Sequence, residues 1–326
     1  MRRLTSGIGK NLVFNRFFNG NAERFKIVEV GPRDGLQNEK TLVPAVTKVE
    51  LIDRLSDCGL QTVEVTSFVS PKWVPQMADN NQVLNGIKQK PGVSYPVLVP
   101  NMAGLKAALA NPNVKEIAVF GAASESFTRK NTNCSMEESL KRLKEVAEEG
   151  IKHGLAVRGY ISMVIGDPDE GAIDPRIVAK ISEQLFSFGC YEVSLGDTIG
   201  VGSARTTGKM LDEVLKVAPA GKFAVHCHDT YGQALSNVLV AIEKGIRVAD
   251  ASISGLGGCP YAKGATGNLA TEDLLYMLND LGFETGVDLD RLIETGQWIC
   301  KEMGRENASR AGRALLTRKE RQSKRG

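Results

Sequence analysis

Residues 26–35 read KIVEVGPRDG, and this stretch opens the pattern that identifies the fold. Residues 26–30 form a short run rich in β-branched side chains, which predicts a buried strand. The following residues, Gly31 to Gly35, lack the spaced glycines of a dinucleotide-binding loop. A doubly wound open sheet, the main alternative, is therefore less well supported than a barrel.

The same pattern recurs along the chain, with each hydrophobic run followed by an amphipathic stretch. The runs cover residues 26–30, 62–68, 94–99, 115–120, 156–164, 191–195, 223–228 and 248–253. Nearly continuous apolar runs are typical of parallel strands that are covered on both faces. Eight strand–helix units in about 280 residues predict an α/β fold, a (β/α)8 TIM barrel. Residues 274–304 predict additional C-terminal helices that close it.

The charge pattern divides the chain into three parts. Residues 1–25 form an N-terminal extension, and its first 22 residues hold four basic side chains and no acidic one. That composition is typical of a mitochondrial transit peptide, although a bacterial extension is the alternative. Residues 26–304 form the barrel domain. Residues 305–326 form a basic tail with eight basic and two acidic residues, which we expect to be frayed or disordered.

Three global features narrow the class of protein. The net charge of +3 arises at the two ends, so the body is acidic, which argues against a nucleic-acid partner. No apolar run reaches the ~18–20 residues of a membrane span. Six cysteines without a CxxC pair indicate free thiols in a reducing compartment. We therefore expect a mitochondrial matrix protein or, alternatively, a bacterial cytoplasmic one.

Chemically useful side chains lie in or just after several predicted strands, at the end where barrel enzymes carry their active sites. They are Arg33, Asp34, Gln37, Glu64, Tyr160, Ser194, Asp197, His226, His228, Cys259 and Asn268. The gathering of these groups on one rim predicts an active site there.

The clearest local motif is His226-Cys227-His228 in the seventh run. Residues i and i+2 of a strand share a face, so the two imidazoles lie on the same side with about 6–7 Å between their Cα atoms. Asp34, after the first run, is a natural third ligand because the first and seventh strands of a closed barrel are near neighbours. Two imidazoles and a carboxylate suit an octahedral divalent ion. The alternatives are a hydrogen-bonded interior pair and, for Asp34, a surface turn.

Two further residues offer chemistry beside this predicted metal site. Arg33 is a fixed cation that could stabilise negative charge developing on a carbonyl oxygen, unless it only forms a structural salt bridge. Cys259 lies in the glycine-rich stretch 255–267, which could close over a substrate as a lid. Its thiol could then exchange a proton, although a lone cysteine is more often inert.

Five stretches resemble the 3-hydroxy-3-methylglutaryl-CoA lyase family. They are VEVGPRDGLQNEK (28–40), TSFVSPKWVPQ (66–76), SLGDTIG (194–200), AVHCHDTYGQ (224–233) and SGLGGCPYAKGATGNLATED (254–273). The resemblance spans residues 26–304 and implies cleavage of 3-hydroxy-3-methylglutaryl-CoA (HMG-CoA) to acetyl-CoA and acetoacetate, with Mg²⁺ or Mn²⁺. It implies that the metal is surrounded by Asp34, His226, His228 and Asn268.

The resemblance also assigns roles to other residues. Arg33 is implied to be catalytic and Cys259 to be the lid thiol, while the base is left open among Asp34, a water and the histidine pair. We expect substrate-orienting or supporting roles for Gln37, Glu64, Tyr160, Ser194 and Asp197. The expected partners are an acyl-CoA substrate and a second copy of the chain in a homodimer.

Two other functions remain open to the sequence. One is a condensing synthase of the same barrel group, which would release free CoA instead of acetoacetate. The other is a non-catalytic protein that binds a metal or CoA.

Overall fold

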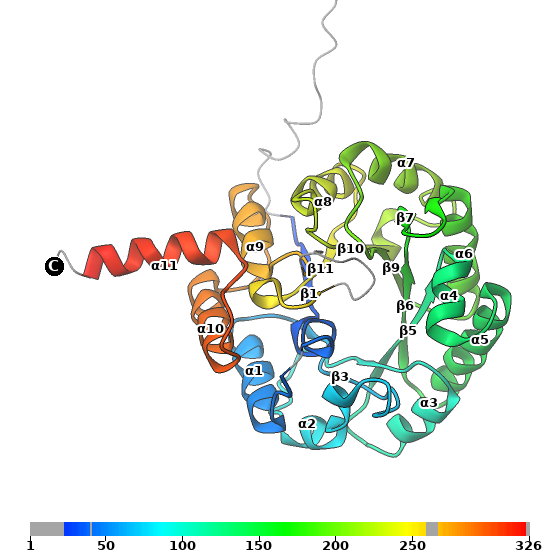
Figure 1. The fold of residues 1–326 in the computed structure, drawn as a ribbon, viewed down its shortest axis with the longest axis horizontal. Coiled ribbons are helices and arrows are strands. Elements are labelled where there is room, and N and C mark those ends of the chain that lie inside the picture. The colour runs from blue at the N-terminus through cyan, green and yellow to red at the C-terminus, as the bar shows by residue number, and fades with distance from the viewer. Residues whose placement is uncertain (1–22, 40, 259–266, 324–326) are drawn as a thin grey trace, which may run out of the picture.

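The computed structural model describes residues 23–39, 41–258 and 267–323, and it contains a closed ring of parallel strands surrounded by helices (Figure 1). The nine strands are β1 (Lys26–Glu29), β2 (Thr62–Val63), β3 (Thr66–Ser67), β4 (Val97–Leu98), β5 (Glu116–Ala122), β6 (Ala156–Ser162), β9 (Glu192–Asp197), β10 (Phe223–Cys227) and β11 (Val248–Ala251). Their order is β2-β1-β11-β10-β9-β6-β5-β4-β3. All neighbouring pairs are parallel.

The first and last strands in this order, β2 and β3, belong to one predicted run, residues 62–68. Glu64 donates its backbone N–H to the carbonyl of Glu29 in β1 (2.8 Å), and Val65 donates to the carbonyl of Pro96 beside β4 (3.0 Å). The run therefore bonds to both neighbours, which closes the barrel. The predicted fold class and all eight predicted runs are confirmed, with the second run divided into β2 and β3.

Helices follow the strands and cover the outside of the ring. They are α1 (Ala45–Asp57), α2 (Asn80–Gly86), α3 (Met102–Leu109), α4 (Glu125–Thr132), α5 (Met136–Lys152), α6 (Pro175–Ser187), α7 (Ala204–Val214) and α8 (Ala234–Glu243). Local sequence explains where several begin: Ser135 caps α5, Asp174 precedes Pro175 in α6, and Ser203 forms a capping box in α7. A short hairpin, β7 (Gly166–Asp167) with β8 (Gly171–Ala172), follows β6.

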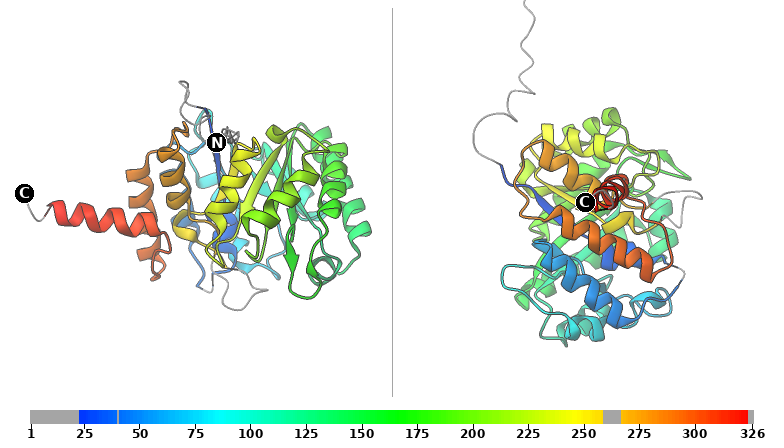
Figure 2. Two further views of the ribbon diagram at one scale, coloured as in Figure 1. Left: turned by 90° about the horizontal axis from the view of Figure 1, so that it is seen from above. Right: turned by 90° about the vertical axis from the view of Figure 1, so that its left-hand side faces the viewer.

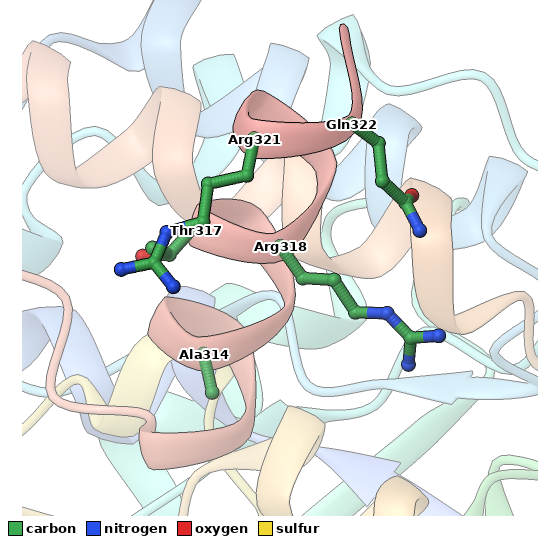
Figure 3. Close-up of a pocket in the computed structure, with 5 residues that line it drawn as sticks. All are labelled: Ala314, Thr317, Arg318, Arg321 and Gln322. Carbon is green, nitrogen blue, oxygen red and sulfur yellow. The ribbon is translucent and has the colours of Figure 1, made fainter. Parts of the chain in front are cut away.

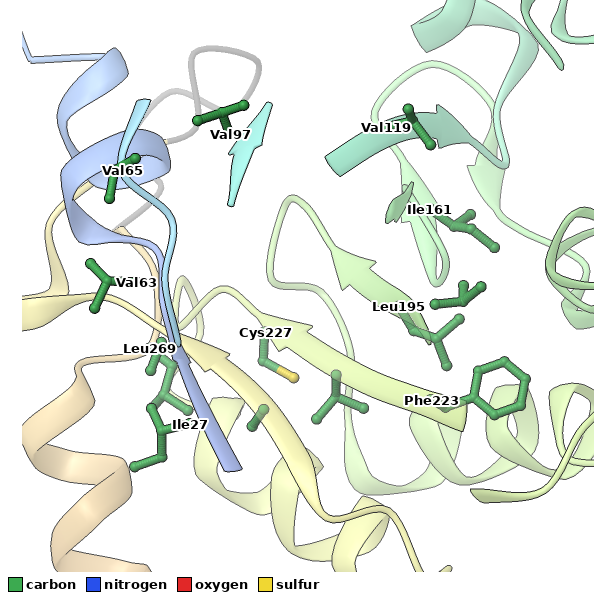
Figure 4. Packing of buried hydrophobic residues seen from close by; sticks show 14 of the residues in the cluster. Ile27, Val63, Val65, Val97, Val119, Ile161, Leu195, Phe223, Cys227 and Leu269 are labelled. Atoms are coloured by element: carbon green, nitrogen blue, oxygen red, sulfur yellow. The ribbon is translucent and has the colours of Figure 1, made fainter. Parts of the chain in front are cut away.

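The main hydrophobic core lies between the strands and these helices. Figure 4 shows alternate strand residues that point outward into it, among them Ile27, Ile161 and Leu195. Cys227 belongs to this core, so it faces away from the neighbouring histidines, as the alternation of a strand requires. Burial raises the pKa of its thiol well above the ordinary value, which suits a packed rather than a reactive cysteine.

Three α-helices follow the last strand in the part of the chain that the structure describes. α9 (Thr271–Asp280) and α10 (Leu289–Glu302) are the predicted closing helices. α11 (Arg310–Ser323) projects from the barrel (Figure 2), so the expectation of a frayed tail is wrong for this segment. A hollow of about 340 Å³ lies along its far end, lined by Ala314, Thr317, Arg318, Arg321 and Gln322 (Figure 3).

The predicted boundary of the N-terminal extension also shifts. Phe25 is buried against the ring of Phe283, and its backbone N–H donates to the carbonyl of Glu284 (3.0 Å). It therefore belongs to the barrel domain. The predicted transit peptide, residues 1–22, lies outside the described residues. Within the described ranges, every helix is too short or too polar to cross a membrane.

Candidate active site

The candidate site lies at the ends of β1, β10 and β11, where the chain leaves the barrel. After β1, residues Gly31–Gly35 form one tight π-helical turn in which Arg33 and Gly35 both donate their N–H groups to the carbonyl of Val30. Glu29 holds the start of this turn, since its carboxyl accepts the N–H of Gly31 (2.8 Å). The turn directs Arg33 and Asp34 to the mouth of the barrel.

Asp34, His226 and His228 form a cluster whose nitrogen and oxygen ligand atoms all lie within 4.8 Å of one another. Nε2 of His226 lies 3.9 Å from Oδ2 of Asp34, and the centres of the two imidazole rings are 5.3 Å apart. The structure therefore brings together the three side chains that the sequence analysis joined into a metal site. The three are buried or nearly so.

Two buried atoms, one in the cluster and one in the neighbouring Asn268, lack hydrogen-bond partners, and they indicate what the cluster can hold. Asn268 donates its amide to Oδ2 of Asp34 (2.8 Å) and to the carbonyl of Leu256 (3.1 Å), while its Oδ1 is unpartnered. Nδ1 of His228 is also unpartnered. Leaving a buried polar atom unsatisfied costs about 1–3 kcal/mol. A divalent cation bound between nitrogen and oxygen donors would offset such a cost, so these residues fit a metal.

The charges of the cluster suit a cation as well. Burial alone would raise the pKa of Asp34, but Arg33 and the two imidazoles lower it to about 2, so it is a carboxylate. Burial and the neighbouring His226 lower the pKa of His228 to about 4. His228 is thus a neutral imidazole at neutral pH, the form that can ligate a metal.

Arg33 is fixed beside Asp34 by carboxylates on two sides. Its Nη1 donates to Oδ1 of Asp34 (2.7 Å), while Nε and Nη2 donate to the two oxygens of Glu64 (2.8 and 3.1 Å). Burial works to lower the pKa of Arg33, but Glu64 and Asp34 raise it above its ordinary value. Tyr160 donates its hydroxyl to Glu64 (2.7 Å), and Gln37 donates to Oδ1 of Asp34 (2.9 Å). Of the predicted supporting residues, Gln37 and Glu64 therefore contact the Arg33–Asp34 pair directly, and Tyr160 contacts Glu64.

His226 has a partner that the sequence analysis missed. Its Nδ1 lies 3.3 Å from Oδ2 of Asp250, which also accepts the hydroxyl of Ser194 (2.7 Å). Burial works to lower the pKa of His226, but Asp250 and Asp34 raise it overall. Asp250 is in turn held by Arg158 (Nη2 to Oδ1, 2.7 Å). A carboxylate on one ring nitrogen orients the other toward a metal.

Of the other predicted residues, Asp197 stands apart from the cluster. The carboxylate of Asp197 accepts the backbone N–H groups of Val201 (3.1 Å) and Gly202 (2.8 Å), so it organises the loop after β9. Burial raises its pKa to about 6. Cys259 lies in 259–266, outside the described residues. The stretch before it passes close to the cluster: a Cβ at Gly257, which has φ +117°, would lie 2.7 Å from Nδ2 of Asn268.

A parallel (β/α)8 barrel with carboxylate, imidazole and amide groups at its mouth, spaced so that they could hold a metal ion, is the arrangement of a barrel enzyme. The HMGL-like family model matches residues 24–299, and the chain belongs to this family. The resemblance predicted from the motifs is thereby confirmed.

Named relatives match almost the whole chain. The mitochondrial hydroxymethylglutaryl-CoA lyase of Gallus gallus is 57% identical over 292 residues, which cover 90% of this chain and 98% of that protein. The cytoplasmic 3-hydroxy-3-methylglutaryl-CoA lyase of Danio rerio is 58% identical over 289 residues, which cover 89% and 86%. The crystal structure of hydroxymethylglutaryl-CoA lyase from Pseudomonas aeruginosa matches with a TM-score of 0.89 and 54% identity, covering 91% and 99%.

Proposed function

We propose that this chain is a carbon–carbon lyase that cleaves HMG-CoA to acetyl-CoA and acetoacetate, a reaction of ketone-body formation and leucine breakdown. The observation that carries the proposal is the 57% identity to a named lyase over 98% of that protein's length. The cluster at the barrel mouth supports the proposal, because Arg33, the proposed catalytic cation, contacts Asp34, a member of the proposed metal site.

We infer that the site takes Mg²⁺ or Mn²⁺, held by Asp34, His226, His228 and Oδ1 of Asn268. Carboxylate, imidazole and amide donors suit these ions, and no thiolate belongs to the cluster among the described residues. When bound, such an ion supplies the Lewis acidity that makes the tertiary hydroxyl of the substrate easier to deprotonate. Asp34 and the two imidazoles are the groups of this chain that can accept the proton.

Arg33 is positioned to stabilise the enolate that carbon–carbon cleavage leaves on the thioester side. Its guanidinium is held by two carboxylates and cannot lose its proton near neutral pH, so its charge is present before the reaction begins. Cys259 is proposed to return a proton to the enolate carbon, on the strength of the family motif. Gly257 and Gly258, just before it, lie beside Asn268 and Asn38.

The same proposal extends to partners and location. We infer that the substrate is an acyl-CoA, that the chain forms a homodimer, and that it works in the mitochondrial matrix. The composition of residues 1–22 supports the matrix, whereas relatives are named both mitochondrial and cytoplasmic. Sequencing the N-terminus of the protein purified from its own cells would test whether the extension is removed.

One assay tests the proposed reaction directly. Purified protein is incubated with HMG-CoA and Mg²⁺ or Mn²⁺, with and without a chelator, and acetoacetate is measured. We expect release of acetoacetate that stops when the metal is removed. Release of free CoA from acetyl-CoA and a 2-oxo acid would favour a condensing synthase instead. Binding without turnover would refute catalysis.

A further inference from the structure

The segment after α10 contacts every loop that carries a residue of the proposed metal site. We call residues 305–311 the C-terminal clasp; they join α10 to the first turn of α11. The three loops follow β1, β10 and β11 and come from distant parts of the sequence. Paired strands and a bridge between His228 and Asn268 hold the bases of these loops, and contacts from outside the loops can fix their spacing further.

The first contact is made to the loop that bears Asp34. Arg305 forms an ion pair with Glu39, five residues beyond Asp34. The backbone N–H of Glu39 donates to the carbonyl of Leu36 (2.9 Å), so Glu39 belongs to the same compact turn. Arg305 therefore ties the end of this turn to the clasp.

The second contact is made to the loops around Asn268. Asp273, five residues after Asn268, accepts the hydroxyl of Ser309 (2.7 Å) and the backbone N–H groups of Arg310 (3.2 Å) and Ala311 (2.7 Å). Ser309 is fully buried, so water does not compete for these bonds. The N–H of Ala308 also donates to the carbonyl of Ser254 (3.1 Å), where the glycine-rich stretch begins.

The third contact reaches the residue next to His228. Nη1 of Arg310 donates to Oδ2 of Asp229 (2.7 Å), and Oδ1 of Asp229 accepts the N–H of Ala234 (3.0 Å). The N–H of Asp229 donates to the carbonyl of Gly267, beside Asn268 (3.2 Å). The loops of His228 and Asn268 are thus joined by backbone bonds, and Arg310 ties Asp229, next to His228, to the clasp.

We propose that Arg310 is a positioning residue for the metal site, acting through Asp229 on His228, and that the clasp sets the spacing of the three loops. This inference rests on the proposed function for the identity of the metal site. The side chain of Arg310 is 66% exposed, and exposed ion pairs contribute little to stability. Its loss should therefore change metal affinity much more than folding.

The test compares Arg310→Ala and Arg310→Lys with a matched control, Lys319→Ala. Lys319 is a cation of the same helix whose partners, Asp290 and Glu294, lie on α10 and not on a site loop. Mn²⁺ binding to each full-length protein is titrated by electron paramagnetic resonance, and melting temperature and HMG-CoA cleavage are measured alongside. Asp229→Asn serves as a second variant that breaks the same contact from its other side.

We expect Arg310→Ala to raise the Kd for Mn²⁺ about 3- to 10-fold, below the 10- to 100-fold typical of direct ligand partners. Arg310→Lys should restore most of the affinity, and Lys319→Ala should match the wild type in both Kd and melting temperature. Cleavage by Arg310→Ala should recover at saturating Mn²⁺ with KM for HMG-CoA unchanged.

Two results would overturn the inference. One is a wild-type Kd for Mn²⁺ in both Arg310→Ala and Asp229→Asn. The other is an equal loss of affinity in Lys319→Ala, which would point to α11 as a whole. A wild-type protein that binds Mn²⁺ with the expected pattern among variants but releases no acetoacetate would refute the proposed function and leave the positioning role standing.

Discussion

Replacing Asp250 by Asn tests how the barrel interior orients His226. The carboxylate serves donors on both sides: Oδ1 accepts from Arg158 (2.7 Å), and Oδ2 accepts from Ser194 (2.7 Å) and faces Nδ1 of His226 (3.3 Å). An asparagine amide keeps the shape but has only one oxygen. In either orientation of the amide, its NH2 group therefore faces a donor, Arg158 on one side or Ser194 and His226 on the other. The negative charge that orients the imidazole of His226 is also lost.

The expected losses in metal affinity and in unfolding free energy follow from these contacts. Removing the carboxylate partner of a metal-ligating histidine typically costs about 10- to 100-fold in metal affinity. Breaking a buried ion pair by removing one partner costs about 3–5 kcal/mol when the other charge is left uncompensated. Arg158 keeps a second carboxylate, Glu192, on its Nε (2.8 Å), so we expect a loss of about 2 kcal/mol in unfolding free energy, below that range.

A matched control separates the two effects. Glu192→Gln also removes one carboxylate from Arg158, but no contact joins Glu192 to His226 in the described structure. We expect both variants to lower the free energy of unfolding in urea, and only Asp250→Asn to weaken Mn²⁺ binding. Equal metal affinity in the two variants, or a wild-type Kd in Asp250→Asn, would refute the argument that Asp250 orients the ligand.

Three further changes probe other parts of the site. His228→Ala should abolish turnover and weaken Mn²⁺ binding, and unchanged metal content with normal turnover would defeat its proposed role. Cys259→Ala should fold normally and lose about 100-fold in kcat, whereas alkylation of Cys259 without effect on the rate would contradict a role in proton transfer. Burial raises the pKa of Glu29 from 4.5 to about 7, so the fold favours its neutral form. The stability that this protonation contributes is complete below about pH 4.5 and is lost as the pH rises through 7, about 3 kcal/mol in all. Glu29→Gln should remove this pH-dependent contribution to stability, so the free energy of unfolding of the wild type in urea should fall relative to that of the variant between pH 5 and pH 8. A difference that does not change with pH would disprove the raised pKa of Glu29.

The central cluster was predictable because two simple regularities determine it. The alternation of a strand places His226 and His228 on one face, and closure of the barrel brings the loop after the first strand near the seventh. Cys227 follows from the same alternation and lies on the opposite face. Local pattern and topology were therefore sufficient to bring together the three side chains of the proposed metal site.

Asp250 escaped prediction because its role depends on register. It pairs with His226 across β10 and β11, and no local pattern states which residues of two parallel strands stand opposite each other. An available signal was the single acid within the mostly apolar run 248–253. An acid buried in a barrel strand needs a cation or a hydrogen-bond donor nearby. His226, at the matching depth of the neighbouring strand, was a candidate partner.

The C-terminal helix was missed for a different reason. Its composition is strongly basic, and a basic chain end is more often solvated than ordered. The helix begins where it does because Asp273 accepts the N–H groups of Arg310 and Ala311, and Ser309 accepts that of Gly312 (2.8 Å). Ser309 is a local cap, but Asp273 lies 37 residues before Arg310, so this part of the signal that starts α11 is tertiary and is absent from the local sequence.

The buried charges of the barrel favour a bound cation at the proposed metal site. Two arginines stand in the interior, and Tyr160 lies between them, with its ring centre 5.7 Å from the guanidinium of Arg33 and 4.8 Å from that of Arg158. Their partners are four carboxylates, those of Asp34, Glu64, Glu192 and Asp250. Lys26 adds one further cation at Glu192, and a protonated His226, whose pKa Asp250 and Asp34 raise, would be a fourth. A metal-ligating His226 must be neutral, and the four carboxylates then outnumber the three cations. Because His228 is neutral, the excess negative charge lies toward Asp34, and a divalent ion there would balance it. Replacing Asp34 by Asn should therefore reduce the affinity for the ion by more than the loss of one ligand. Glu64→Gln touches no proposed ligand directly but removes the same charge, so it should weaken Mn²⁺ binding measurably. An unchanged Kd in Glu64→Gln would show that ligand geometry alone, and not the charge of the interior, determines affinity.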